Sequence, residues 1–251
     1  MQRRKLTMSL ALAPLSCVVS GLAFSQTENT SKQDSVQRPF RKVSVPEDGR
    51  LVIFFFDFAC PFCAAYHGPL HNFSGTVPKQ VQTMFIPVVN MADVARRQEQ
   101  MIAAQCFYSA LQVANKSQMA LFAGSVYESY SIVRNLSAKA IWIKAVKVAG
   151  IDLKKFTAAL QAGKNDSQIQ FAARKNIQYA LTVTPSVAVG GKYVITPEDV
   201  MGDQEKFFQL LNGLTSEILW PIQNSQASTL NLDCLMHKPK RNQTRSHVQL
   251  I

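Results

Sequence analysis

The sequence of 251 residues is poor in charge and in cysteine, and it has a single long apolar run. Charged residues make up 17% of the chain and hydrophobic residues 47%, which excludes a disordered protein, because such chains are poorer in apolar residues. Five cysteines are too few for a disulfide-stapled scaffold of this length. Several membrane spans would need several apolar runs of about 20 residues. With no internal repeat, the chain is expected to form one or two compact units.

The single apolar run stands at the N-terminus. Basic residues at positions 3–5 precede the uncharged stretch 6–24, which ends in small residues around Ser25. This order is typical of a secretory signal peptide, so we predict export and cleavage near Ser25. The alternative is an uncleaved anchor, which Pro14 and Gly21 disfavour because they dilute the apolar run.

Export changes how the remaining cysteines are interpreted. Cleavage removes Cys17 and three basic residues, which lowers the formal net charge from +11 to +8 and leaves Cys60, Cys63, Cys106 and Cys234. In an oxidising compartment, disulfide exchange is the leading interpretation of a close cysteine pair. The basic residues are scattered and not interleaved with aromatic residues, so we expect no nucleic-acid partner and a modest bias toward acidic client proteins.

Hydrophobic periodicity predicts an α/β protein. The continuous apolar run 51–58 is typical of a strand buried on both faces. A helix is expected to start at Cys60, with Pro61 at its first position, and to be broken or kinked at Gly68-Pro69. After a second strand at 81–89, apolar residues recur every three or four positions, which predicts helices.

The second half is expected to return from helices to strands. Asn165 is a candidate cap of the expected helix 166–180, and Gly190-Gly191 suits a tight hairpin because both residues tolerate positive φ angles. Phe55, Phe56 and Phe58 are expected in the core. The expected helices are 119–132, 138–149, 152–162, 166–180 and 203–219, and the expected hairpin strands are 186–189 and 192–195.

The most informative segment is Cys60-Pro61-Phe62-Cys63. A cysteine at a helix N-terminus meets unpaired N–H groups and the positive end of the helix dipole, which favour the thiolate. We therefore predict a lowered pKa for Cys60, as the exchanging sulfur, and an inward-facing Cys63 that resolves mixed disulfides. A stabilised thiolate favours the reduced protein and makes its disulfide oxidising.

Two other interpretations of the cysteine pair carry less weight. A zinc site needs four ligands, and His67 and His71 on the following helix are expected to face solvent, so no metal is predicted. A purely structural Cys60–Cys63 disulfide would close too short a loop to constrain the unfolded chain. Its position at a strand-to-helix junction favours chemistry.

Three features together resemble the DsbA-type thiol:disulfide oxidoreductases of the bacterial envelope: FFFDFACPFCAAYH, the helical block in mid-chain and VTPSVAVGGKYVI. The resemblance covers roughly 45–220 and implies a thioredoxin fold with an inserted all-helical domain. It implies a cis peptide at Pro185, against the alternative of an ordinary trans turn. The residues implied for substrate binding are Pro61, Phe62, Thr184 and Pro185, beside the catalytic Cys60 and Cys63.

The resemblance also implies a setting. The expected protein is a periplasmic monomer with no cofactor besides its own disulfide, which oxidises reduced client proteins and is reoxidised by a membrane partner similar to DsbB. The expected parts are a signal peptide (1–25), a thioredoxin-fold domain in two pieces (26–90 and 166–224), the inserted helical domain (91–165) and a flexible polar tail (225–251).

The sequence departs from the family pattern in three places. Phe62 replaces the commonest histidine and offers the thiolate no hydrogen bond, although the CPFC form resembles DsbL-type members. Phe54 stands where the family often has a buried glutamate, and the nearest acid, Asp57, is either a proton acceptor for Cys63 or an exposed residue at the strand end. The residue before the proline is Thr184, and threonine also occurs at this place in envelope isomerases, so the sequence does not decide whether the cysteine pair is oxidising or reducing.

The sequence leaves two alternatives for Cys106 and Cys234. Cys106 lies in an apolar-periodic helix and Cys234 in the polar tail. They either form a disulfide or stay unpaired, with Cys106 packed as a small hydrophobe. Three functions follow from the sequence: an exported oxidase, an isomerase or reductase kept reduced, and a chaperone-like binding module whose dithiol is inactive.

Overall fold

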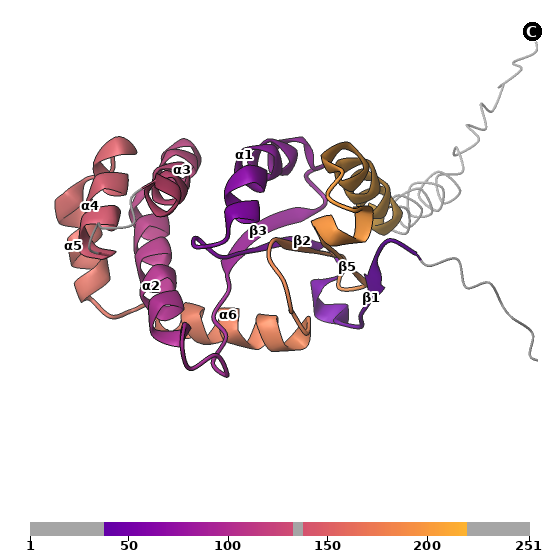
Figure 1. Ribbon diagram of the computed structural model, residues 1–251, viewed down its shortest axis with the longest axis horizontal. Helices are drawn as coiled ribbons and strands as arrows, with labels where there is room; N and C mark the ends of the chain where they lie inside the picture. Colours follow the sequence, from indigo (N-terminus) through magenta and orange to yellow (C-terminus); the bar gives the residue numbers. More distant parts are fainter. Residues whose placement is uncertain (1–37, 133–137, 220–251) are drawn as a thin grey trace, which may run out of the picture. The chain divides into compact units, whose positions relative to one another are not determined.

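A computed structural model describes residues 38–132 and 138–219 (Figure 1). The predicted signal peptide, the predicted tail and Cys234 lie outside the described residues, so pairing of Cys106 with Cys234 stays open. Cys106 itself is buried and forms no disulfide with another described cysteine. Within the described ranges, no helix has the length and apolar character needed to cross a membrane.

The centre of the fold is a five-stranded mixed sheet in the order β1-β5-β4-β2-β3. The interior strand β2 pairs in parallel with β3 and antiparallel with β4, and β5 pairs antiparallel with β4 and β1. Residues 52–56 of β2 are buried, which confirms the prediction of a strand covered on both faces. The strands are β1 (Arg41–Lys42), β2 (Leu51–Phe56), β3 (Gln82–Pro87), β4 (Ser186–Val189) and β5 (Tyr193–Ile195).

The hairpin between β4 and β5 forms at the glycine pair. Gly190 and Gly191 both have positive φ angles, 60° and 62°, and the N–H of Lys192 donates to the carbonyl of Val189 across the turn. A side chain at Gly191 would collide with the carbonyl oxygen of Val45. The two glycines therefore meet a steric as well as a torsional requirement.

The helices occur where the periodicity predicts them. Helix α1 is continuous through Pro69, so the helix is not broken at Gly68-Pro69, and the alternative of a kink there stays a prediction. The described helices are α1 (Pro61–Thr76), α2 (Arg97–Val113), α3 (Lys116–Ile132), α4 (Ala138–Val148), α5 (Leu153–Gln161), α6 (Asp166–Gln178) and a last helix over 204–219. Short 3₁₀ turns at Pro46–Asp48 and Pro197–Val200, and strand β1, were not predicted.

Alternate residues of β2 enter two different cores. Val52 and Phe54 pack with α1 and the 204–219 helix, including Phe207 and Leu211. Ile53 and Phe55, on the other face, pack toward α6 and the helical block. The ribbon shows the same layering, with α1 on one side of the sheet and α6 on the other (Figure 1).

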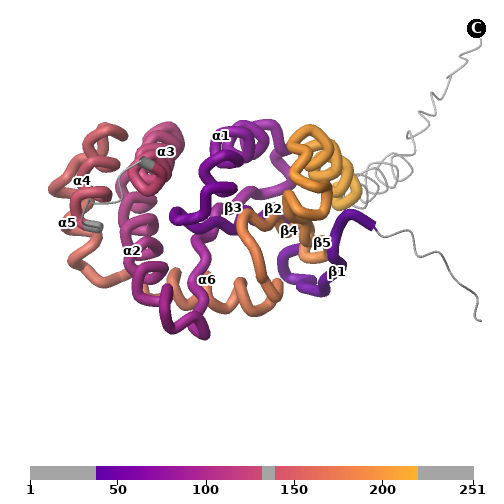
Figure 2. Tube along the Cα trace, viewed as in Figure 1, coloured from indigo at the N-terminus to yellow at the C-terminus, as the bar shows by residue number. Residues whose placement is uncertain are grey.

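Five described helices, α2 to α6, lie between β3 and β4 in the chain. Contacts join α2 with α5 and α3, and α4 with α3 and α5, and these four helices form a group beside the sheet (Figure 2). Helix α3 also contacts α1. The block therefore packs against the helix that begins at the cysteine pair.

Helix α6 is held at both ends by side chains. Asn165 stands at the N-cap position, as predicted, but its side chain makes no capping hydrogen bond. Its amide donates to Ser109 at 2.7 Å and so ties the start of α6 to α2. Near the other end, the Lys175 ammonium and the Tyr179 hydroxyl both donate to the buried carboxylate of Asp48 at 2.7 Å.

Candidate active site

The cysteine pair lies where β2 gives way to α1. Cys60 is the N-cap residue, with extended φ and ψ angles of −88° and 118°, and Pro61 opens the helix. The N–H of Cys63 donates to the Sγ of Cys60 over 3.4 Å. The sulfur of Cys60 thus takes the place of the oxygen that usually caps a helix, next to the positive end of the helix dipole.

The loop before β4 brings the second part of the site. Thr184-Pro185 is a cis peptide, which confirms that prediction, and the thiol of Cys60 donates to the carbonyl of Thr184 over 3.1 Å. These residues are 124 positions apart in the chain. The sheet brings them together because β4 pairs directly with β2.

The surroundings of Cys60 favour its thiolate. Hydrogen bonding by the Cys63 side chain is the largest cause, and contacts from Thr184 and from the N–H groups of Cys63 and Phe62 add to it. Partial burial acts in the opposite direction. Together they lower the pKa of Cys60 from 9.0 to about 6, so the sulfur is mostly ionised at neutral pH.

Cys63 lies in the opposite environment. It is 2% exposed, and burial raises the pKa of its thiol far above the ordinary value, with a further rise from the Cys60 side chain. Its Sγ accepts a 3.5 Å hydrogen bond from the N–H of Asp57. Both cysteines are free thiols in this structure, and the inward orientation predicted for Cys63 is confirmed.

Asp57, directly after β2, is a buried and fully engaged acid. Arg96 binds both of its carboxylate oxygens, at 2.9 and 3.1 Å, and Gln100 donates to one of them at 3.1 Å. The N–H of Ala59 donates to the other at 2.9 Å. The interpretation of Asp57 as an exposed residue at the strand end is therefore wrong, and we call this arrangement the Asp57–Arg96 clasp.

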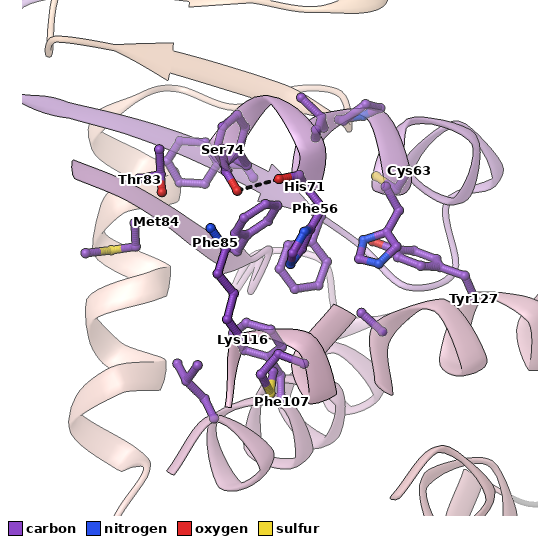
Figure 3. A pocket seen from close by; sticks show the side chains of 18 of the residues that line it. Phe56, Cys63, His71, Ser74, Thr83, Met84, Phe85, Phe107, Lys116 and Tyr127 are labelled. Carbon is purple, nitrogen blue, oxygen red and sulfur yellow. Dashed lines mark hydrogen bonds between the residues drawn. The ribbon is translucent and has the colours of Figure 1, made fainter. Parts of the chain in front are cut away.

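A largely apolar cavity of about 400 Å³ lies on the inner side of the pair, lined by residues of α1, β3, α2 and α3. Cys63 and Tyr127 both line it, at the same end (Figure 3). His67 and His71 also line it, so the expectation that they face solvent is wrong. Desolvation lowers the pKa of both imidazoles.

The spacing of His67 from Cys63 is a signal in the sequence that indicates a partly buried position for His67. His67 follows Cys63 by four residues, so both lie on one face of α1, and Cys63 is buried. A hydrogen bond of 3.2 Å joins the Nε2 of His67 to the carbonyl of Ala120 on α3. The Asp57–Arg96 clasp had no comparable signal, because its partners are 39 positions apart.

The structure brings together four of the residues predicted for the site. Cys60, Cys63 and Thr184 are linked by hydrogen bonds, and Pro185 lines the same cavity as Cys63. Phe62 points outward and is 64% exposed, while Pro61 is exposed beside it. An ionisable sulfur, a buried partner thiol and an open rim together form a site suited to thiol–disulfide exchange.

Comparison with known proteins agrees with this geometry. The sequence model of the family described as thioredoxin matches residues 47–206. The chain belongs to the thioredoxin family. Within it, the chain is a DsbA-type thiol:disulfide oxidoreductase, similar to the thiol:disulfide interchange protein DsbA of Bordetella pertussis, with 23% identity over 202 residues, 78% of this chain and 89% of the relative.

Solved DsbA structures share the fold. Pseudomonas aeruginosa DsbA superposes with a TM-score of 0.62 at 18% identity, over 74% of this chain and 95% of that one. Proteus mirabilis DsbA with a non-covalently bound peptide superposes with a TM-score of 0.58 at 13% identity, over 72% of this chain and 96% of that one. The predicted fold class, a thioredoxin fold with a helical insertion, is confirmed.

Proposed function

We propose that this DsbA-type protein is an oxidase that donates the Cys60–Cys63 disulfide to reduced client proteins in the bacterial periplasm. The observation that carries the proposal is the contrast between a Cys60 thiol whose pKa is lowered to about 6 and a buried Cys63 thiol whose pKa is raised. A stabilised thiolate lowers the free energy of the reduced protein, so its disulfide tends to pass to other thiols.

The exchange proceeds in two balanced steps. A client thiolate attacks the Sγ of Cys60; the Cys60–Cys63 bond breaks, and the sulfur of Cys63 leaves and takes up a proton, as its raised pKa requires. The client's second thiolate then attacks the client sulfur of the mixed disulfide and expels Cys60 as a thiolate. The client loses two electrons and the cysteine pair gains them. A low pKa makes Cys60 a good leaving group in this second step.

The rim of the site supports a protein substrate. Phe62 is exposed between the cysteines, and the N–H of Thr184 has no hydrogen-bond partner among the described residues. That N–H is available to the main chain of an extended client. The peptide carried by Proteus mirabilis DsbA supports the same class of substrate here.

The remaining parts of the proposal concern the setting. The N-terminal pattern at 1–25 supports export with cleavage near Ser25. Multiple turnovers require a membrane partner similar to DsbB that reoxidises the pair. We propose that the protein works as a monomer.

The redox potential of the Cys60–Cys63 pair, equilibrated against glutathione, tests the oxidase. We expect a value less negative than about −200 mV, against about −270 mV for thioredoxin. The Cys60→Ala variant should have no detectable oxidase activity on a reduced client. A potential near that of thioredoxin, or a pair found mostly reduced in trapped cells, would favour a reductase or isomerase. Unchanged client oxidation by Cys60→Ala would favour a binding module.

A further inference from the structure

A second hollow lies beside the Thr184 loop of the exchange site. This cleft of about 490 Å³ lies between the segment that follows β3 and the segment joining α6 to β4. We call it the polar cleft. Its lining includes Asp57, Gln100, Asn176 and Thr184. The cleft is near the carboxyl ends of the parallel strands β2 and β3, where open α/β sheets bind their ligands.

The polar cleft shares one wall with the exchange site. Thr184 lines the cleft, and its carbonyl accepts the hydrogen bond of the Cys60 thiol at 3.1 Å. A client joined to Cys60 through a disulfide therefore starts next to the mouth of the cleft. An extended chain advances about 3.3 Å per residue, so the residues flanking the client cysteine are within reach of it.

One side chain in the lining has unused hydrogen-bonding capacity. Asn176 is 8% exposed, and both atoms of its side-chain amide lack a hydrogen-bond partner among the described residues. Buried polar groups are nearly always paired. An amide offers both a donor and an acceptor, which complements a peptide group, itself a donor and an acceptor.

The charges of the lining disfavour an ionic ligand. Among the described residues that line the cleft, Arg96 is the only cation, and its guanidinium is bound to both carboxylate oxygens of Asp57. Asp93, a further lining acid, accepts a hydrogen bond from the N–H of Arg96. The polar groups therefore suit a neutral main chain better than a carboxylate or a phosphate.

Two large apolar side chains in the lining of the cleft are exposed. Met91 is 47% exposed and Ile177 75% exposed, and both belong to the lining. Large apolar side chains that stay in water beside a polar hollow are typical of an interaction site. They offer a surface for the apolar side chains of a bound segment, while the interior offers hydrogen bonds.

We infer that the polar cleft binds an extended, uncharged segment of the client polypeptide next to the cysteine that reacts with Cys60, with Asn176 pairing a client peptide group and Met91 and Ile177 contacting client side chains. The inference rests on the proposed function, because it names where the substrate of that reaction is held. Asn176 is thus a residue that positions substrate and not one that takes part in exchange.

Comparing a peptide with a small thiol tests the inference. The oxidised exported protein is mixed either with dithiothreitol or with a neutral peptide of about ten residues that carries two cysteines and spans about 30 Å when extended. Second-order rate constants for reduction of the Cys60–Cys63 disulfide are measured by quenching and mass spectrometry. Asn176→Leu should slow the peptide reaction about threefold to tenfold, the range of one hydrogen bond, and leave the dithiothreitol reaction unchanged.

A stability measurement separates binding from folding. Since the side-chain amide of Asn176 has no hydrogen-bond partner in the part of the chain that the structure describes, Asn176→Leu should unfold at the same temperature as the wild type or a higher one. Ile177→Ser, an exposed change that folding should tolerate, should also slow only the peptide. Val148→Ser, at a position 54% exposed on α4, is the matched control and should change neither rate.

The outcomes distinguish the two proposals. If the wild-type disulfide oxidises neither thiol, the proposed oxidase function fails. If it oxidises both, while Asn176→Leu and Ile177→Ser leave the peptide rate unchanged or slow both thiols equally, the oxidase stands and the cleft is not a client site. A slower peptide reaction in Val148→Ser would equally overturn the assignment.

Discussion

Cys60 and Cys63 stand one helical turn apart, yet their environments differ in almost every respect. The first sulfur is at the helix N-terminus, half-buried, and accepts a main-chain N–H. The second is 2% exposed in the core that joins the sheet to the helical block. The pKa falls at one position and rises at the other. Residue type is the same, so the difference comes from position on the helix and from burial.

This contrast supports the order of events that we propose for exchange. The accessible sulfur with the lower pKa is the one that a client can attack and the one that leaves easily as a thiolate. The buried sulfur of Cys63 is accessible only to a group that is already bonded to the sulfur of Cys60. A single helical turn therefore places the outer and inner partners of the reaction at fixed positions.

Removing the inner sulfur should have the largest effect. In Cys63→Ala no intramolecular disulfide can form, so oxidase turnover should fall by on the order of 10³-fold or more, as for other groups that act as a unit. Because nothing inside the protein can release a client from Cys60, mixed disulfides should persist when the variant is mixed with oxidised clients. Non-reducing gels with and without dithiothreitol would detect them.

A matched control for this variant is Cys106→Ala, which removes another buried cysteine. Burial raises the pKa of Cys106 to about 12, and we place it outside the exchange site. Its removal should leave turnover intact. If Cys63→Ala gave no mixed disulfides, or linked clients elsewhere than at Cys60, the assigned order of attack would be wrong.

The second prediction concerns the titration of the outer sulfur. With a pKa lowered from 9.0 to about 6, the thiol of Cys60 ionises as the pH rises through about 6. At pH 7 the thiolate is then roughly nine-tenths of the population, against about one-hundredth for an ordinary thiol. Alkylation of the reduced protein by iodoacetamide should therefore reach half of its maximal rate near pH 6, and Cys63 should stay unmodified.

The same shift links pH to stability. Because the folded-state pKa of Cys60 is depressed, its thiolate stabilises the reduced protein above the unfolded pKa, and this contribution disappears as the pH falls through about 6. Reduced wild type should therefore gain stability relative to Cys60→Ala between about pH 6 and pH 9. An alkylation midpoint near that of an ordinary thiol would remove the basis for an oxidising disulfide.

The features that could be predicted from the sequence are those that depend on neighbouring residues in the chain. The buried strand predicted at 51–58, the helix start at Cys60 and the hairpin at Gly190-Gly191 each depend on residues next to one another in the chain. The structure contains all three, with the strand ending at Phe56. The juxtaposition of Cys60 with Thr184 is long-range, and it was expected only through the family resemblance.

The missed features depend on contacts between elements distant in the chain. The orientation of His67 depends on helix α3 lying against α1, and the pairing of Asp57 with Arg96 depends on how the segment after β3 folds back. The side chain of Asn165 serves α2 instead of capping α6 because Ser109 and Gln105 lie within reach of its amide. A single sequence contains the partners but not their distances.

The smallest predicted effect concerns the free energy of unfolding. It tests whether the Asp57–Arg96 clasp stabilises the segment next to the sulfur of Cys63. Arg96→Leu leaves the carboxylate of Asp57, 9% exposed, without its cation. Losing one partner of a buried pair costs about 3–5 kcal/mol; because the side chain of Arg96 is 39% exposed, water compensates in part, and we expect about 1–3 kcal/mol in urea unfolding. Adding Asp57→Asn should recover some of this loss, since no buried charge then remains unpaired.

The exposed ion pair of Lys144 with Glu128, at 3.2 Å, supplies the control for the clasp. Both side chains are largely in water, so Lys144→Leu should change the free energy of unfolding by less than about 0.5 kcal/mol. Equal losses for Arg96→Leu and Lys144→Leu would mean that the clasp is no stronger than a surface pair. The hydrogen bond from the N–H of Asp57 to the sulfur of Cys63 would then not depend on Arg96, and the contacts between Asp57 and the start of α2 would not contribute to the difference between the two sulfurs.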